Sequence, residues 1–236
     1  MDVIKNELTN LGIYHNTDKA FFHSFTDFYY EYFKNLKENN LNILELGILN
    51  GKSLMMLRDF FTNSTLYGID INPDSVKNYG PRIKTFLCSQ TDNNKLTELF
   101  SNIQFDIIID DGSHMTLHQL QSLGFLFKYL KKGGLYICED LHTSVKSSYI
   151  NSTTIPLNIL NEYASNKSLN IPEILKEDND YINDNIQDII LYKRNKNAIK
   201  CYGCLTPNIK NLPQCSKCNI NLSPTDLSIT SIIVKK

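Results

Sequence analysis

The chain has 236 residues, with 24 Lys and Arg against 25 Asp and Glu, and 42% of its residues are hydrophobic. This balance gives no electrostatic basis for coating a long nucleic acid or an anionic membrane surface. No apolar run approaches the roughly 18–20 residues of a membrane span, and the first residues lack a signal-peptide pattern. We therefore expect a cytoplasmic protein with a substantial core and no membrane partner, and we disfavour nucleic acid as a partner.

Residues 1–40 are predicted to be helical, with an aromatic-rich stretch from Phe21 to Phe33 that is typical of a packed core. After residue 40, short apolar runs alternate with amphipathic segments. The predicted strands are 41–47, 66–70, 83–88, 105–110 and 135–139, and the predicted helices are 53–61, 94–101 and 116–130. Lys131–Gly134 is predicted to end the last of these helices. The alternation predicts an α/β fold with a doubly wound, Rossmann-like sheet.

Residues 143–182 are polar and rich in Asn, with one predicted helix near 157–163, and we expect them to form a mobile cover over the sheet edge. Two further strands are predicted at 188–193 and 228–234. A terminal antiparallel hairpin with an enlarged connection accounts for this pattern.

The connection of the hairpin carries four cysteines: Cys201, Cys204, Cys215 and Cys218. In a reducing compartment two CxxC pairs indicate metal ligands rather than disulfides. Four thiolates complete a tetrahedral site with no open position, so we predict one structural Zn²⁺, with iron as the chemical alternative. We expect this site to be remote from any catalytic chemistry.

A glycine-containing loop follows the first predicted strand, from Glu45 to Ser53. The spacing Gly47-x3-Gly51-Lys-Ser is one residue short of a phosphate-binding loop, and Leu49 stands where a dinucleotide fingerprint needs glycine. The pattern ExGxxxG fits without adjustment, and it resembles the corresponding loop of class I S-adenosylmethionine (SAM) methyltransferases.

Polar residues after the next two predicted strands are further candidates for contacts with the nucleoside part of the ligand. Asp70 is placed to accept ribose hydroxyls, although it could equally form a turn before Asn72-Pro73. Gln90 and Asp92 are candidates for the adenine edge, with a helix-capping turn as the alternative.

Two acidic pairs end the fourth and fifth predicted strands, Asp110-Asp111 and Glu139-Asp140. These strands are neighbours in a doubly wound sheet, so their carboxylates should converge and attract a hard cation. Oxygen ligands favour Mg²⁺ over Zn²⁺. His114, three residues after Asp111, is placed to act as a general base. The alternatives are helix caps for the acids and a helix-start role for the histidine.

Several motifs together resemble those of the metal-dependent sugar O-methyltransferases of macrolide antibiotic biosynthesis, of the mycinamicin type. The resemblance covers about residues 12–194 and the final strand. Its motifs are Asn16–Lys19 with His23, Glu45–Gly47, Tyr67–Asp70, Cys88–Asp92, Asp110–His114 and Gly133–Asp140. Ser89 stands where the family usually has Asp, and the four-cysteine segment is no part of the family pattern.

The resemblance implies a role for each matching residue. Asp111, Glu139 and Asp140 would bind Mg²⁺, and His114 would be the general base, with Asp111 beside it in the catalytic set. The implied SAM contacts are Glu45, Gly47, Asp70, Gln90 and Asp92, with Thr17 and Lys19 closing over the ligand. We add Ser53 and Asp110 to the predicted SAM contacts.

We therefore predict an O-methyltransferase that uses SAM and Mg²⁺ to methylate a hydroxyl of a sugar or a glycosylated small molecule. The predicted organisation is a helical cap (1–40), a methyltransferase domain (41–194) with a substrate cover (143–182), a zinc ribbon (195–226) and a final strand (227–236). Self-association as a homo-oligomer is left open.

Two other functions are weighed against this one. The first is a nucleic-acid or protein-binding module on a degenerate fold, because basic residues cluster around the ribbon: Lys193, Arg194, Lys196, Lys200, Lys210 and Lys217. The second is an RNA 2′-O-methyltransferase. Such enzymes usually rely on lysines placed around an Asp, and we find no such set in this sequence.

Overall fold

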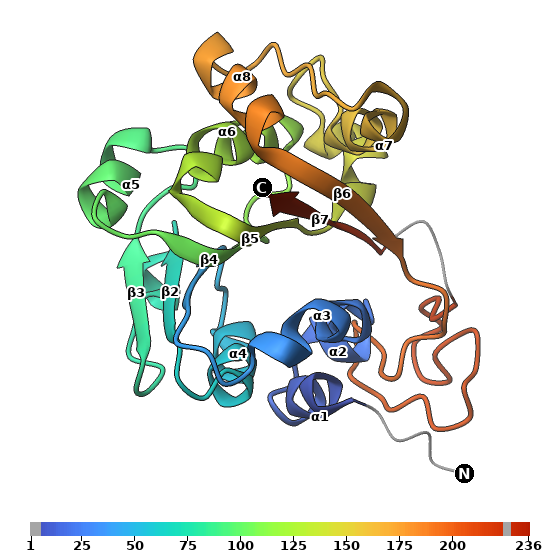
Figure 1. Ribbon diagram of the computed structural model, residues 1–236. Helices are drawn as coiled ribbons and strands as arrows, with labels where there is room; N and C mark the ends of the chain where they lie inside the picture. Colours follow the sequence, from blue (N-terminus) through green and yellow to red (C-terminus); the bar gives the residue numbers. More distant parts are fainter. Residues whose placement is uncertain (1–5, 224–227) are drawn as a thin grey trace.

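A computed structural model describes residues 6–223 and 228–236. Its strands form a central sheet with helices on both faces (Figure 1). The strands are β1 (Asn42–Leu46), β2 (Thr65–Asp70), β3 (Ile83–Leu87), β4 (Phe105–Asp110), β5 (Leu130–Cys138), β6 (Ile186–Lys193) and β7 (Ile229–Lys235). The α-helices are α1 (Glu7–Tyr14), α2 (Asp18–Phe21), α3 (Phe25–Phe33), α4 (Lys52–Phe60), α5 (Asn93–Phe100), α6 (Thr116–Leu126), α7 (Pro156–Asn166) and α8 (Lys176–Asn185). Short 3₁₀ turns are η1 (Lys34–Leu36), η2 (Pro73–Ser75), η3 (Phe127–Tyr129), η4 (Leu141–Val145) and η5 (Ser147–Tyr149).

The seven strands lie in the order β3-β2-β1-β4-β5-β7-β6. β1 to β5 are parallel, and β7 pairs antiparallel with both β5 and β6. The predicted α/β sheet with a terminal antiparallel hairpin is confirmed. Strand order reverses between β1 and β4, and a crevice for ligands lies at such a point beyond the carboxyl ends of the strands.

The two faces of the sheet carry separate cores because successive strand side chains point to opposite faces. Ile107 and Ile109 of β4 pack with Phe25, Tyr29 and the other apolar residues of α1, α3 and α4. Ile108, on the other face, packs with side chains of α5, α6, α7 and α8. The aromatic-rich stretch therefore belongs to the core, as predicted.

Two predicted boundaries are wrong. The helix predicted over 116–130 ends at Leu126, and Lys131–Gly134 lies within β5 instead of stopping the helix. The β4–β5 ladder is irregular there, and Gly133 adopts φ 72°, so the glycines mark a β-bulge. The helix α8 was not predicted, because its sequence is polar and only Ile182 is buried.

The segment 143–182 contains the predicted helix as α7. Leu160, Tyr163, Leu169, Ile171 and Ile182 of this segment are buried in the core shared with α6 and β6. Most of the expected cover therefore packs on one face of the sheet.

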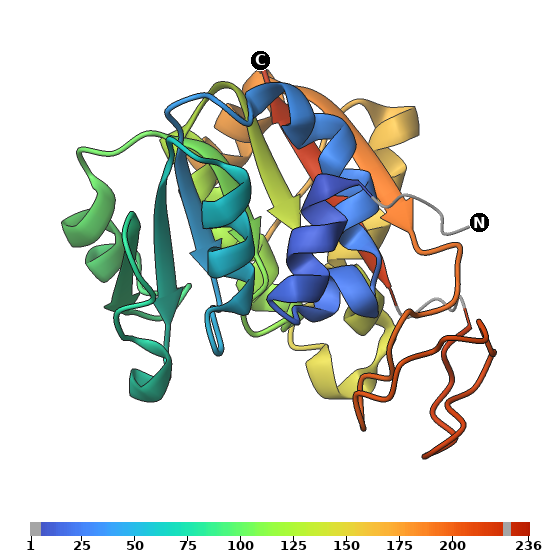
Figure 2. The same cartoon turned by 90° about the horizontal axis from the view of Figure 1, so that it is seen from below.

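The four-cysteine segment connects β6 to β7 and lies beside the N-terminal helices in both views (Figures 1 and 2). The backbone N–H groups of Ile199 and Lys200 donate to the carbonyl of Phe21, at 2.7 and 3.2 Å. No helix within the described ranges is long and apolar enough to cross a membrane.

Candidate active site

A cavity of about 700 Å³ opens beyond the carboxyl ends of β1, β2 and β4. This volume lies within the range of small-molecule sites. Its lining residues that we predicted from the sequence are Thr17, Lys19, Glu45, Gly47, Ser53, Asp70, Asp111, His114 and Asp140. The structure thus brings together residues from five separate segments of the chain.

The glycine loop is built for close backbone packing. Gly47 has φ 79°, and a Cβ on it would lie 2.3 Å from the carbonyl oxygen of Asp111. Gly51 has φ 71°, and a Cβ there would overlap the ring of Tyr79. Both glycines of the ExGxxxG pattern are therefore required by the backbone. Gly47 lets the loop pack against the residues that follow β4, and Gly51 leaves room for the ring of Tyr79.

Asp70 organises the same loop from the end of β2. Its Oδ2 accepts hydrogen bonds from the backbone N–H groups of Ile48 (3.0 Å) and Leu49 (2.9 Å). Its Oδ1 accepts from the N–H of Asn72 at 2.8 Å, so the turn-forming alternative is also present. The carboxylate lines the cavity as well, where it is available to a ribose.

Lys19 of α2 lies among the acidic groups. Its ammonium, on a side chain only 2% exposed, donates to Glu139 Oε2 at 2.8 Å and to Asp111, and lies 3.5 Å from Glu45. Burial opposes the charge, but the carboxylates of Asp111, Glu139 and Glu45 raise the pKa of Lys19 well above its usual value. This lysine neutralises part of the acidic cluster.

Asp140 faces three histidines. His114 Nε2 lies 3.8 Å from Asp140 Oδ2, and His23 and His142 place Nδ1 at 3.8 and 3.7 Å from Oδ1. His114 Nε2 is also 4.0 Å from Asp111 Oδ1. His23 and His142 lack a distinctive sequence context, and we did not predict their place beside Asp140. The sequence signals were the position of His23 in a family motif and the place of His142 two residues after Asp140.

Burial shifts several of these groups toward their neutral forms. It raises the pKa of Asp140 to about 8 and that of Glu45 to about 7, in each case despite an opposing contribution from Lys19. It lowers the pKa of His23 to about 3 and that of His142 to about 4. At Asp140 the cost of burial therefore outweighs the favourable contributions of Lys19 and Lys146.

Backbone strain coincides with the same residues. His114 and Asp140 are not glycines, yet they have φ values of 57° and 52°, in the left-handed region. Such positions cost free energy and concentrate at functional sites.

The donor atoms near Asp140 fit a divalent cation. Ligand atoms of Asp111, His114 and Asp140 all lie within 4.8 Å of one another. Asp140 Oδ1 and Glu139 Oε1 are buried and accept no hydrogen bond. Buried carboxylate oxygens without donors are the groups that a hard cation would satisfy.

Three predicted SAM contacts do not line the cavity. Gln90 is buried and donates from Nε2 to Asp110 at 3.1 Å, while its Oε1 accepts from the N–H of Ser113 at 2.7 Å. Asp92 caps α5 by accepting from the N–H of Lys95 at 3.0 Å. Gln90 and Asp110 support the loop that carries Asp111 and His114, and their contact with SAM stays a prediction.

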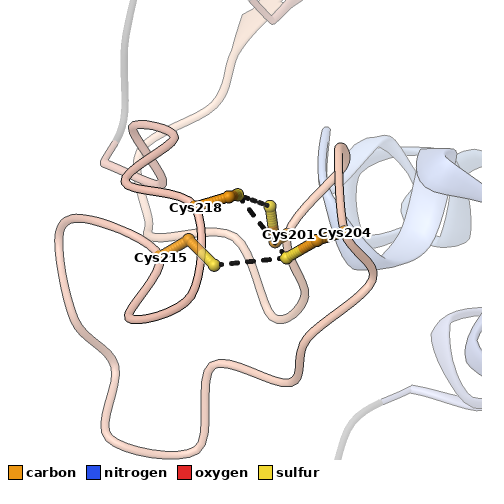
Figure 3. A group of neighbouring side chains, drawn as sticks. All are labelled: Cys201, Cys204, Cys215 and Cys218. Atoms are coloured by element: carbon orange, nitrogen blue, oxygen red, sulfur yellow. Dashed lines mark hydrogen bonds between the residues drawn. The ribbon is translucent and has the colours of Figure 1, made fainter.

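The four cysteines form one cluster from two turns (Figure 3). The sulfurs of Cys201 and Cys218 are 3.4 Å apart, and Cys204 lies 3.5 Å from both Cys215 and Cys218. A tetrahedron with Zn–S bonds of about 2.3 Å has edges of roughly 3.8 Å, so the cluster is near the size that a metal needs. A hydrogen bond with Thr206 lowers the pKa of Cys204 to about 6, which favours the thiolate.

The first of these turns reaches the cavity. Tyr202, between Cys201 and Cys204, and Leu205, directly after Cys204, both line it. The expectation that the four-cysteine segment is remote from the chemistry is therefore wrong for this turn. Spacing alone does not reveal where a loop docks.

The comparisons with known proteins agree with this geometry. The family model described as a methyltransferase domain matches residues 37–211. The tetracenomycin rhamnosyl 2′-O-methyltransferase of Streptomyces olivaceus is 34% identical over an alignment of 145 residues, and the match covers 58% of this chain and 38% of that protein. The mycinamicin VI 2″-O-methyltransferase of Micromonospora griseorubida is 34% identical over 149 residues, 59% of this chain and 37% of its own.

A solved structure of the MycE methyltransferase from the mycinamycin pathway, in complex with Mg, S-adenosylhomocysteine (SAH) and mycinamycin VI, superposes with a TM-score of 0.65. It is 28% identical, and the match covers 80% of this chain and 53% of that one. The chain spans less than two-fifths of the length of these curated relatives.

The family match extends from the end of the helical cap into the four-cysteine segment, and it includes the glycine loop and both acidic pairs. The chain belongs to the methyltransferase domain family.

Proposed function

We propose that this chain transfers a methyl group from SAM to a hydroxyl of a sugar or a glycosylated small molecule. One observation carries the proposal. A single cavity joins the glycine loop and Asp70 to the cluster of Asp111, His114 and Asp140. The relatives, whose names describe methylation of sugar hydroxyls, support the same acceptor class.

The glycine loop, Asp70 and Ser53 would hold SAM at one end of the cavity, with its methyl group toward the acidic end. Asp111 and Asp140, with Glu139 behind them, would hold Mg²⁺. A divalent cation there would supply Lewis acidity toward the acceptor hydroxyl.

His114 would take the proton from that hydroxyl as the C–O bond forms and the C–S bond of SAM breaks, which leaves SAH. Its Nε2 faces the acidic end of the cavity, within 4.0 Å of both Asp111 and Asp140. The cavity walls would align sulfur, methyl carbon and oxygen, and alignment supplies much of the rate in such a transfer.

The structure does not favour the binding-module alternative. Arg194, one of the basic residues around the ribbon, is 2% exposed, and its guanidinium lies 4.8 Å from the ring centre of Phe22. Lys200 donates to Asn16 at 2.7 Å, and Lys196 pairs with Asp27. These three cations therefore contact the N-terminal helices, while Lys210 and Lys217 are exposed on the ribbon. The acidic cluster in the cavity, which a binding module does not need, favours the enzyme.

We further propose that the four cysteines bind one structural metal, Zn²⁺ or iron. Among the ribbon residues that the structure describes, few apolar side chains other than the cysteines are buried, chiefly Ala198 and Leu222. Metal binding would therefore supply much of the folding free energy of the ribbon. Elemental analysis of protein purified without chelators identifies the ion.

The methyl-transfer proposal is tested with radiolabelled SAM and a panel of methyl and phenyl glycosides. We expect turnover that EDTA abolishes and Mg²⁺ restores. His114→Ala should lower kcat roughly 10²–10⁴-fold while SAH still binds in calorimetry. Full activity in EDTA would refute the Mg²⁺ role, and the absence of SAH binding to the wild type would refute the methyltransferase proposal.

A further inference from the structure

The two cysteine turns share one backbone design. In the first turn (201–206), the N–H of Leu205 donates to the carbonyl of Cys201 at 3.0 Å. In the second turn (215–220), the N–H of Asn219 donates to the carbonyl of Cys215 at 2.9 Å. Leu205 and Asn219 have φ values of 58° and 60°. The two turns are therefore equivalent, residue for residue, with a spacing of fourteen positions.

The first turn carries an aromatic and an apolar side chain at two positions where the second turn carries polar ones. The equivalent of Tyr202 is Ser216, and the equivalent of Leu205 is Asn219. Asn tolerates the left-handed region, whereas a branched apolar residue is strained there. Leu205 is also 46% exposed, so neither backbone preference nor burial in the core explains its presence. Strain of this kind points to a function at the position.

The first turn is held at the acidic end of the cavity. The ring of Tyr202 lies 5.5 Å from the ring of Phe22, whose neighbour Phe21 accepts the two backbone hydrogen bonds from the ribbon. Phe22 in turn contacts His23, with 4.9 Å between the ring centres, and Nδ1 of His23 lies 3.8 Å from Oδ1 of Asp140. Tyr149 from η5 also lines this end, with its ring 6.3 Å from that of His114.

We propose that the first cysteine turn is the wall of the active site that holds the methyl acceptor, with Tyr202 and Leu205 in contact with it. The proposal rests on the proposed methyl transfer. An aromatic ring and an apolar side chain beside the acidic cluster suit a sugar ring that presents its C–H face, or an apolar aglycone. The metal of the four cysteines would fix this wall in place.

The test compares substitutions at equivalent positions of the two turns. Leu205→Gly and Tyr202→Ala remove the wall, and Asn219→Gly and Ser216→Ala are the matched controls. Leu205→Gly relieves the left-handed strain, so its zinc content and resistance to urea should equal or exceed those of the wild type. These two measurements therefore distinguish a loss of activity caused by unfolding from one caused by the lost contact with the acceptor.

We expect both wall variants to raise the KM for phenyl and methyl glycosides about tenfold or more. The KM for SAM, the Kd for SAH and the zinc content should stay within twofold, and the controls should match the wild type in every measurement. Unchanged acceptor KM in Leu205→Gly and Tyr202→Ala, with active wild type, would overturn the wall while leaving the proposed function intact. If the wild type methylates none of the glycosides, the proposed acceptor class fails, and the wall that rests on it fails too.

Discussion

The ammonium of Lys19 lies 2.8 Å from the carboxylate of Glu139, and both side chains are only 2% exposed. The lysine comes from a helix of four residues near the start of the chain, and the glutamate follows β5. The same ammonium contacts Asp111 and Glu45, so one cation balances acids that follow or end three strands of the sheet.

We expect Lys19→Met to lower the free energy of unfolding by about 3–5 kcal/mol, because it leaves buried carboxylates without their cation. Urea denaturation at neutral pH measures the loss. Lys34→Met is the control, since Lys34 pairs with Glu31 on the surface and its loss should leave the stability close to that of the wild type. Equal stability of the two variants would show that Lys19 is not needed to balance the acids.

The buried Glu45 should make stability depend on pH. Burial, partly opposed by Lys19, raises the pKa of its carboxyl from 4.5 to about 7. Between these values the folded state holds a proton that the unfolded state has lost, so stability falls as the pH rises through this window and levels off above it.

Glu45→Gln should flatten this part of the pH profile. One pKa unit corresponds to about 1.4 kcal/mol, so between pH 5 and pH 8 the wild type should lose roughly 2–3 kcal/mol more than the variant. Urea titrations at both pH values provide the comparison. Glu162→Gln, at an exposed position on α7, should keep the wild-type slope. Parallel profiles for wild type and Glu45→Gln would show that Glu45 stays ionised in the fold.

Asp70→Asn should weaken SAH binding by at least about 2 kcal/mol, or roughly thirtyfold in Kd. The carboxylate holds the backbone of the glycine loop and faces the cavity, so an amide disrupts both functions. Calorimetry with SAH measures the change. Asp74→Asn, on the exposed turn η2, should bind like the wild type. Undiminished affinity in Asp70→Asn would remove this residue from the nucleoside site.

Cys215→Ser should lose the metal and raise the KM for the acceptor while changing the Kd for SAH less than about threefold. In the proposed arrangement the acceptor lies against the first cysteine turn, whereas SAM lies against Asp70 and the glycine loop. Elemental analysis, calorimetry and kinetics on one preparation give the three values, with Ser216→Ala as control. A Kd for SAH that rises in step with metal loss would instead make the ribbon part of the SAM site.

Much of the fold could be predicted because strands such as Phe105–Asp110 are buried on both faces and read as continuous apolar runs. The convergence of Asp111 with Asp140 followed from the same reasoning, since neighbouring parallel strands end at one edge. The helix α8 could not be predicted, because a helix that buries only Ile182 has almost no apolar periodicity.

The composition of the site was harder to predict than its location. His23 reaches Asp140 from the connection between α2 and α3, whose position depends on tertiary packing, whereas His142 lies only two residues after Asp140 in the turn η4. The sequence likewise does not show that Phe21 anchors the ribbon, because that contact uses backbone groups that every residue has. Tyr202 and Leu205 were missed for this reason, although the strained φ of Leu205 marks the position once the fold is known.

The position of β7 between β5 and β6 has a consequence for the order of folding. The strand that completes the sheet is the last one along the chain, and it can dock only after the long connection from β6 has closed. Loop closure costs about 0.6 kcal/mol of chain entropy for each doubling of length. By tying Cys201 to Cys218, metal capture would shorten that connection before the strand arrives. The cysteine cluster would then act as a folding clamp, and refolding should be faster in the presence of metal than after chelation.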